Sequence, residues 1–182
     1  MPSILGANTL SSGYDVANSC KFDGDGDSLS KEISGVNTTK LTISFWFKVC
    51  QIDGTYGNML FSSENNSSDY LAIHQNTSGN LDIQMTGTAN RRITNARYTD
   101  RSAWYHLVVA FDSTQGTASN RQKIYINGDR VTSFSTSNAP ALNFEGEINK
   151  NGVQHYISDT AALFNGYLAD VHFIDGQALA PT

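Results

Sequence analysis

The chain has few cysteines, few prolines and no long apolar run. Its 182 residues include two cysteines and three prolines. Two cysteines are too few for a disulfide framework, so the fold must depend on a hydrophobic core. No apolar stretch approaches the ~20 residues of a membrane-spanning helix, so no membrane partner is expected. The formal net charge of -5 likewise disfavours nucleic acid as a partner.

The N-terminal sequence has neither the basic start nor the apolar core of a secretory signal, so export by the general pathway is not indicated. Residues 1–18 are polar and show no sustained period. They are predicted to form an arm, either draped over the domain or contacting a neighbouring subunit. The length fits one domain, placed at residues 19–176, with a short tail at 177–182.

The strongest strand signal is the segment at residues 104–112. Both of its alternating sets of side chains are largely apolar, which is typical of a central strand covered on both faces. Further along, Asn127-Gly128 separates two strand-like runs. This pair favours a two-residue hairpin, because both turn positions need a positive φ.

A second clear strand covers residues 41–50. Its apolar set points inward and its other set, which includes Trp46, points outward. Shorter strands are expected at 19–22, 28–30, 58–62, 70–74, 81–85, 153–157 and 167–174, whereas 86–103 and 135–152 have the composition of polar segments. The pattern predicts an all-β fold, an antiparallel two-sheet β-sandwich of the jelly-roll type. The inward residues of the two longest alternating runs are Leu41, Ile43, Phe45, Phe47 and Val49, and Tyr167, Ala169, Val171 and Phe173.

Both cysteines are expected to be free thiols. Cys20 is two residues before Phe22 on the same face of a short strand, which predicts a small buried side chain. Cys50 has the outward parity of its strand. A bridge between the two early strands is the alternative.

Several motifs resemble one known family. They are Trp104-Tyr105-His106 with the following valines and Phe111-Asp112, then Ile124-Tyr125-Ile126-Asn127-Gly128, the early strand Ser44-Phe45-Trp46-Phe47, and the closing run from Phe164 to Leu179. In this order they resemble the concanavalin A-like lectin/glucanase superfamily, especially its laminin-G-like and pentraxin-like branch. The closing run, Asp100–His106 and Ile4-Leu5-Gly6-Ala7 are also similar to structural proteins of marine tailed bacteriophages. The resemblance covers residues 19–179 and implies a concanavalin A-like jelly roll.

The superfamily includes glucanases, so the resemblance makes catalysis one candidate function. Retaining glycoside hydrolysis needs two carboxyl groups about 5–5.5 Å apart. The pattern Glu-x-Asp-x-x-Glu does not occur, and Glu145-Gly146-Glu147 has the composition of an exposed loop. The four histidines are widely separated and predict no metal site. We therefore expect no enzyme activity.

Calcium is the next candidate. Asp23-Gly24-Asp25-Gly26-Asp27 has the carboxylate spacing of an EF-hand loop but lacks the glycine and the glutamate that complete one, so a turn is the commoner explanation. The pentraxin-like resemblance implies calcium at a rim of two loops, which would place Asp69 and Asp159 as ligands. The second loop has a single carboxylate. We therefore expect no required cofactor, with weak calcium binding as the alternative.

Carbohydrate binding needs an aromatic face together with amide and carboxylate groups. The rim implied by the resemblance has these residue types, and a solvated connection is an equally common reason for a polar loop. Trp46 is a further candidate for stacking on a sugar, although burial is favoured. The candidate carbohydrate-binding residues are Tyr56, Asn58, Glu64, Asn65, Asn66, Asp69 and Tyr70.

Four arginines lie close together in the sequence around Tyr98. They could meet an acidic neighbouring subunit or an anionic glycan, but the interleaved polar residues favour a solvated loop. The four are Arg91, Arg92, Arg97 and Arg101.

Together the residues and the resemblance predict a non-enzymatic lectin-like module of a bacteriophage virion. It would belong to a tail fibre, tail tip or capsid-surface appendage and bind host-surface glycan. Its other partners would be virion subunits, with a homo-oligomer expected, and it would be assembled in the host cytoplasm and carried on the particle surface. The alternative is a structural decoration or assembly protein of the virion that binds no small molecule.

Overall fold

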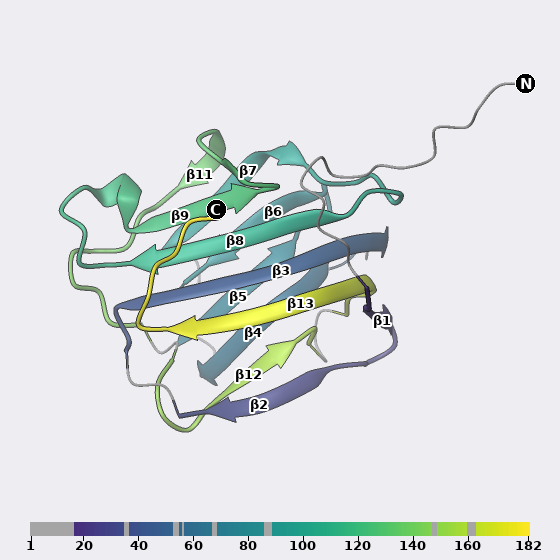
Figure 1. Ribbon diagram of the computed structural model, residues 1–182, viewed down its shortest axis with the longest axis horizontal. Helices are drawn as coiled ribbons and strands as arrows, with labels where there is room; N and C mark the ends of the chain where they lie inside the picture. The colour runs from purple at the N-terminus through teal and green to yellow at the C-terminus, as the bar shows by residue number, and fades with distance from the viewer. Residues whose placement is uncertain are drawn as a thin grey trace, which may run out of the picture.

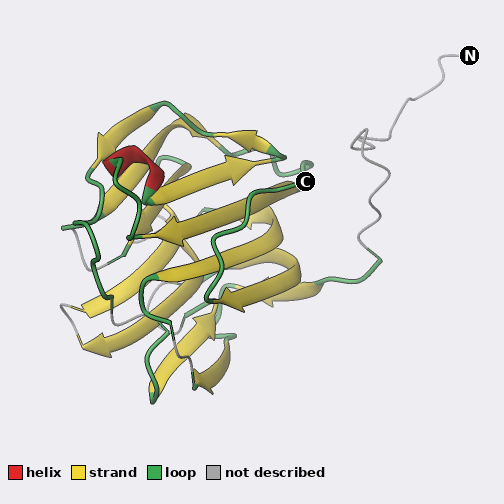
Figure 2. Cartoon of the chain, turned by 60° about the vertical axis from the view of Figure 1, so that its left-hand side comes forward, coloured by secondary structure: helices red, strands yellow, loops and turns green. Residues whose placement is uncertain are grey.

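The computed structural model describes residues 17–34, 37–52, 55, 57–66, 69–85, 89–146, 149–159 and 163–182. The predicted arm, apart from residues 17 and 18, therefore lies outside the described residues. Within them, two antiparallel sheets are packed face to face (Figure 1). Figure 2 shows the same two layers with one short 3-10 helix, η1 (Ala118–Asn120), and no helix there is long and apolar enough to cross a membrane. The predicted all-β sandwich is confirmed.

Each sheet combines strands from distant parts of the chain. The six-stranded sheet has the order β1 (Cys20–Asp23), β13 (Asn165–Asp175), β3 (Lys40–Gln51), β8 (Tyr105–Asp112), β9 (Gln122–Ile126) and β10 (Asp129–Arg130). The seven-stranded sheet has the order β11 (Phe134–Ser137), β7 (Arg91–Arg97), β6 (Asn80–Gln84), β5 (Asp69–Gln75), β4 (Asn58–Asn66), β12 (Val153–Ile157) and β2 (Leu29–Ile33).

The core lies between the sheets and is formed by alternate residues of their strands. On β3 the whole predicted inward set is at most 1% exposed. Phe45 and Phe47 have their ring centroids 6.2 Å apart in an edge-to-face arrangement, a geometry that aromatic pairs favour. From the other sheet, Leu71 and Ile73 are fully buried against them. The alternation therefore determined which face of β3 enters the core.

The hairpin between β9 and β10 also follows its sequence. Asn127 has φ 52° and Gly128 has φ 89°, and Ile126 pairs with Asp129 across the turn. Both turn residues adopt the left-handed conformation that a two-residue hairpin requires. The predicted tight turn is confirmed.

The predicted inward set of β13 is only half correct. The register against β3 shifts between Ala169 and His172, and Asp170 has φ 48°, so the strand carries a bulge there. Before the bulge Leu168 faces the core, and Tyr167 and Ala169 face outward. After it, Phe173 packs against the core as predicted, as does Val171.

Three further predictions are wrong. The segment 86–103 contains β7, and residues 135–137 of the predicted loop 135–152 belong to β11. The pattern concealed β7 because two of its inward residues, Arg92 and Thr94, are polar.

Cys20 is exposed, because it lies at the end of an edge strand, although it shares its face with buried Phe22. Both described cysteines are free, as expected.

The C-terminal segment 177–182 covers part of the outer face of the six-stranded sheet (Figure 1). The Thr42 hydroxyl donates to the Gln177 carbonyl at 2.7 Å and accepts from the Leu179 backbone N–H at 2.8 Å. Ala178 and Ala180 lie near Ala110 of β8, which is 4% exposed. β8 is therefore a central strand with both faces covered at this end, as its sequence predicted.

Candidate functional site

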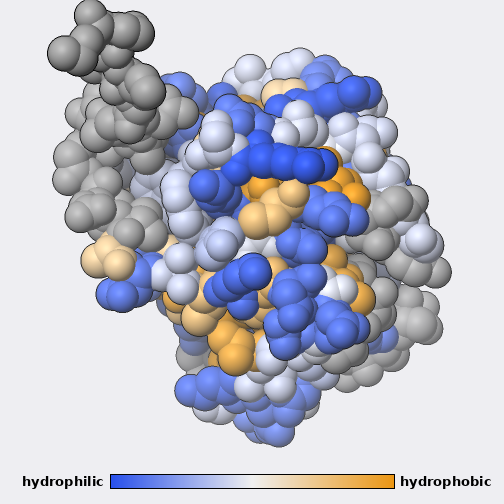
Figure 3. All heavy atoms as spheres, turned by 90° about the vertical axis from the view of Figure 1, so that its right-hand side faces the viewer, coloured by the Kyte–Doolittle hydropathy of each residue, from blue (hydrophilic) through white to orange (hydrophobic). Residues whose placement is uncertain are grey.

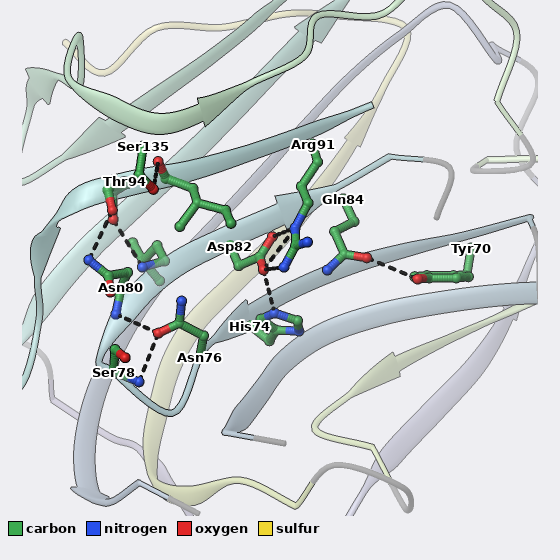
Figure 4. A network of polar contacts seen from close by, with 12 residues as sticks. Tyr70, His74, Asn76, Ser78, Asn80, Asp82, Gln84, Arg91, Thr94 and Ser135 are labelled. Carbon is green, nitrogen blue, oxygen red and sulfur yellow. Dashed lines mark hydrogen bonds and ion pairs between the residues drawn. The ribbon is translucent and has the colours of Figure 1, made fainter. Parts of the chain in front are cut away.

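The outer face of the seven-stranded sheet is polar and crowded. On β5, Leu71 and Ile73 point into the core, so Tyr70, Ala72 and His74 point outward. The alternation continues on β6, where Asp82 and Gln84 face outward between buried leucine and isoleucine residues. This face holds most of the side chains in Figure 4.

Asp82 is the centre of this face, and its side chain is 0% exposed. Its carboxylate accepts from Arg91 Nε at 2.9 Å and 3.1 Å and also from Arg91 Nη2. On the other side, His74 Nε2 lies 3.0 Å from Asp82 Oδ2 (Figure 4). Because an ionised carboxylate only accepts hydrogen bonds, His74 must carry a proton on Nε2. His74, Asp82 and Arg91 thus hold one another in place.

The charges in this cluster shift two pKa values. Burial alone would raise the pKa of Asp82, but the hydrogen bonds and charges of His74 and Arg91 outweigh it and lower the pKa below the usual 3.8. The hydrogen bond to Asp82 raises the pKa of Arg91, against the opposing effect of burial. Asp82 is therefore a fixed anion and Arg91 a fixed cation with a half-buried guanidinium.

A tyrosine and two amides continue the face beside this cluster. The Tyr70 hydroxyl donates to Gln84 Oε1 at 2.9 Å, which fixes the half-buried ring (Figure 4). Exposed Glu64 lies directly opposite Tyr70 in the β4–β5 ladder and opposite Gln154 in the β12–β4 ladder. A fixed aromatic ring, a carboxylate and side-chain amides therefore lie side by side across four strands.

The opposite end of the same face is closed by a rigid turn. The Asn80 side chain donates to the backbone carbonyls of Thr94 at 2.9 Å and Asn95 at 3.2 Å. Asn76 Oδ1 accepts from the backbone N–H groups of Ser78 and Asn80 (Figure 4). These hydrogen bonds join the Asn76 and Asn80 side chains to backbone groups. They therefore hold the strands in place and leave these side chains less available to a ligand.

Of the predicted carbohydrate-binding residues, the structure brings two together on this face, Glu64 and Tyr70. Asn58 is 0% exposed and its amide donates to the Gln51 carbonyl and to Gln75 Oε1, so it is a structural residue and not part of an open site. Tyr56 lies outside the described residues. The remaining three have described backbones at the β4–β5 hairpin but side chains outside the description, and they are Asn65, Asn66 and Asp69.

The backbones that carry the two predicted metal ligands lie well apart. Asp159 accepts from the Ser62 hydroxyl at 2.8 Å, whereas Asp69 pairs with Asn66 at the hairpin end of β4. Four residues of extended strand separate Ser62 from Asn66, roughly 13 Å. Among the described residues, no three His, Cys, Asp or Glu side chains gather in a group that could hold a metal ion.

The other sequence candidates have structural roles. Trp46 is 7% exposed and stacks on His106 with ring centroids 4.8 Å apart, so it has no open face for a sugar. Of the arginine cluster, Arg91, Arg92 and Arg97 lie on β7 rather than in a loop, and exposed Arg101 lies in the turn that follows. Arg92 is 4% exposed, donates to the Gln122 carbonyl and lies over the Phe134 ring, while Arg91 binds Asp82. Asp23–Asp27 forms a turn, with the Asp25 N–H donating to Asp23 Oδ1.

Sequence reasoning did not single out Asp82 or Gln84, and it considered His74 and Arg91 without placing them beside Asp82. Asp82 and Gln84 could have been found, because residues 81–85 alternate and their polar positions had to face outward. Arg91 could not be placed, because the strand that holds it was not recognised. His74 was judged in isolation, and only the β5–β6 register places it opposite Asp82.

Comparisons with known proteins agree on the fold. Domain 4 of AbnA, a GH43 extracellular arabinanase from Geobacillus stearothermophilus solved with arabinotriose, is 17% identical, with a TM-score of 0.65 over 88% of this chain and 72% of that one. A heptameric SAP-like pentraxin from Limulus polyphemus is 16% identical, with a TM-score of 0.58 over 84% and 73%. Domains LG4-5 of the mouse laminin alpha1 chain are 13% identical, with a TM-score of 0.56 over 85% and 40%. A search of curated proteins finds no match.

The family model agrees with these structures and covers nearly the whole chain. It is described as the concanavalin A-like lectin/glucanases superfamily and matches residues 6–182. The resemblance inferred from the strand motifs is therefore confirmed at the level of the superfamily. This chain belongs to the concanavalin A-like lectin/glucanase superfamily.

Proposed function

We propose that this chain is a non-enzymatic, lectin-like module of a bacteriophage virion that binds host-surface carbohydrate. The observation that carries the proposal is the outer face of the seven-stranded sheet, where Tyr70 is fixed by Gln84 beside Glu64 and Gln154. The arabinanase domain that shares this fold was solved with arabinotriose, so the fold is compatible with a bound saccharide. The assignment to a virion rests on the sequence similarity to structural proteins of marine tailed bacteriophages.

Binding on this face would use two kinds of contact. The ring of Tyr70 offers an apolar surface for one side of a pyranose. Glu64 and Gln154 offer acceptors and donors for sugar hydroxyls, while buried Gln84 fixes the ring. Because Tyr70 and Gln84 already hold each other, a ligand would lose little free energy in ordering them. Several copies on one particle would raise the weak affinity of a single site.

The separation of Glu64 and Asp82 favours binding over hydrolysis by this pair of carboxylates. Glu64 and Asp82 lie two strands and four residues apart by the ladder registers. Ladder spacings put them roughly 16 Å apart, beyond the 5–9.5 Å that glycosidases use. Asp82 is also held ionised by Arg91 and His74, so it is a poor proton donor. We propose that purified protein releases no reducing sugar from any glycan that it binds.

A glycan array probed with the purified full chain tests the proposal. Wild type should bind at least one saccharide, and Tyr70→Ala should weaken that binding about tenfold by removing the ring. Tyr70→Phe should retain most of it. The matched control is Tyr125→Ala, which removes another half-buried tyrosine on the six-stranded sheet and should leave binding unchanged. Failure of wild type to bind any saccharide or host envelope would refute the proposal.

The second candidate is a structural decoration or assembly protein of the virion. It is favoured by an apolar groove of about 300 Å³ where the two sheets part at one edge, between β1 and β2. Phe22, Leu29 and Leu168 line it, and Figure 3 shows apolar atoms exposed among hydrophilic ones on this side. Immunoelectron microscopy of intact virions would locate the protein for either candidate. A protein found inside the particle shell would favour this second one.

A further inference from the structure

A row of lysine and aromatic side chains crosses the outer face of the six-stranded sheet. Lys21 of β1 pairs with Tyr167 of β13, and Tyr167 pairs with Lys48 of β3. Trp104 directly precedes β8, and its ring centroid lies 6.3 Å from that of Tyr167. These four residues, Lys21, Tyr167, Lys48 and Trp104, are called the lysine–aromatic row. In Figure 1 the strand ends that hold them meet at the right-hand end of the front sheet.

The alternation of the strands fixes the direction of the row. The neighbours Phe22, Phe47 and Leu168 are all buried in the core, so the residues beside them in each strand point outward. Lys21 is exposed, and the other three members of the row are partly exposed. The row is therefore a surface feature, unlike Trp46, which is two residues away from Lys48 on the same face.

The row lies away from the covered part of this sheet. The C-terminal segment is bound at Thr42, six residues before Lys48 on β3, which is roughly 20 Å of extended strand. The lysine–aromatic row also lies on the other sheet from Tyr70 and Gln84. A ligand on the row would thus be independent of the carbohydrate site proposed above.

The charges of the row favour an anion. Lys21 and Lys48 are two strands apart, so their ammonium groups can stand roughly 10 Å from each other. Among the ion pairs of the described residues, neither lysine takes part. The nearby Asp100 carboxylate accepts from the Ser102 hydroxyl at 2.6 Å and N–H at 2.8 Å within its own turn. These hydrogen bonds, with a smaller contribution from the charge of Lys48, lower the pKa of Asp100. Two cations thus flank an aromatic surface.

We propose that the lysine–aromatic row is a second binding surface, for a polysaccharide that carries sulfate or carboxylate groups. The rings of Tyr167 and Trp104 contact apolar faces of the sugar units. The lysines place their stems along the rings and pair their ammonium groups with the anionic substituents. Single-stranded nucleic acid uses similar groups, but the net charge of -5 disfavours it.

The test is affinity electrophoresis of the full chain in gels that contain dextran sulfate or unsulfated dextran. Dextran sulfate should retard wild type, and the retardation should fall as salt rises, because exposed charge pairs are screened. Lys21→Gln with Lys48→Gln should weaken the interaction about tenfold. The matched control is Lys31→Gln with Lys123→Gln, which removes the same charge elsewhere and should retain the retardation.

Fluorescence gives a second readout, because the chain has only two tryptophans and Trp46 is buried. Dextran sulfate should change the emission of wild type but not of Trp104→Phe. Equal loss in both lysine pairs, no retardation of wild type, or tighter binding to polyuridylate than to dextran sulfate would overturn the proposal. Tyr70→Ala should bind dextran sulfate normally, so failure here and failure of the carbohydrate site at Tyr70 can be told apart.

Discussion

Replacing Asp82 by Asn tests the cluster that organises the outer face of the seven-stranded sheet. The substitution keeps the size of the side chain but removes the charge that Arg91 and His74 bind. Removing one partner of a buried ion pair, while the other stays buried, lowers the free energy of unfolding by roughly 3–5 kcal/mol. The Arg91 side chain is 30% exposed and can recover some hydration, so we expect a loss of about 2–4 kcal/mol in the free energy of unfolding at pH 7.

The loss should depend on pH in a defined direction. The pKa of Asp82 is lower in the folded chain than its usual 3.8. The folded state therefore gains stability from the ionised carboxylate above pH 3.8, and this gain disappears as the pH falls below 3.8 through the lower folded pKa. Asp82→Asn has no carboxylate to titrate. The stability difference between wild type and variant should thus shrink in acid.

Urea unfolding of both proteins at pH 7 and at pH 3 measures the effect. Asp129→Asn is the matched control, because Asp129 is exposed and takes part in none of the ion pairs among the described residues. Its free energy of unfolding should change by less than about 0.5 kcal/mol. An equally large loss in the control, or a difference that is the same at both pH values, would refute the reasoning.

Three other substitutions or treatments test the fold and the cofactor expectation. Gly166→Ala should cost more than about 3 kcal/mol, because the new Cβ would lie 2.2 Å from the Lys48 carbonyl, whereas Gly116→Ala meets no atom within 4 Å and should be neutral in thermal melts. Thr42→Val removes both hydrogen bonds to the C-terminal segment, so the Leu179 amide should exchange with solvent about tenfold faster or more, while core amides remain protected. Adding a calcium chelator or excess calcium should leave Tm unchanged; a calcium-dependent rise of several degrees would indicate a bound ion.

The fold was predictable wherever a strand is apolar on its inward face. The five inward residues of β3 and the turn at Asn127-Gly128 each carry a local signal strong enough to be read alone. β7 carried none, because Arg92 and Thr94 occupy inward positions. Arg92 donates to the Gln122 carbonyl of β9, and the Thr94 hydroxyl accepts from the Leu81 N–H of β6. Such partners are long-range contacts, and no local pattern reports them.

The candidate site was predictable only in part for a related reason. Loop composition indicated Glu64 and Tyr70. It cannot distinguish an exposed amide from a buried one such as that of Asn58, which donates hydrogen bonds to the Gln51 carbonyl and to Gln75. The cluster around Asp82 depends on the register of three neighbouring strands. A shift of one residue between any two of them would send His74 or Arg91 to the core side.

The bulge in β13 shows how one residue can decide where a function lies. Leu168 and Phe173 are five residues apart, so in a regular strand they would face opposite sides. The extra residue at Asp170 lets both contact the core. As a result Tyr167, which precedes the bulge, and His172, which follows it, both point outward. Without the bulge, burying Phe173 would also bury Tyr167. The lysine–aromatic row would then lose its central ring, so the surface proposed for anionic polysaccharide depends on a feature that alternation alone excludes.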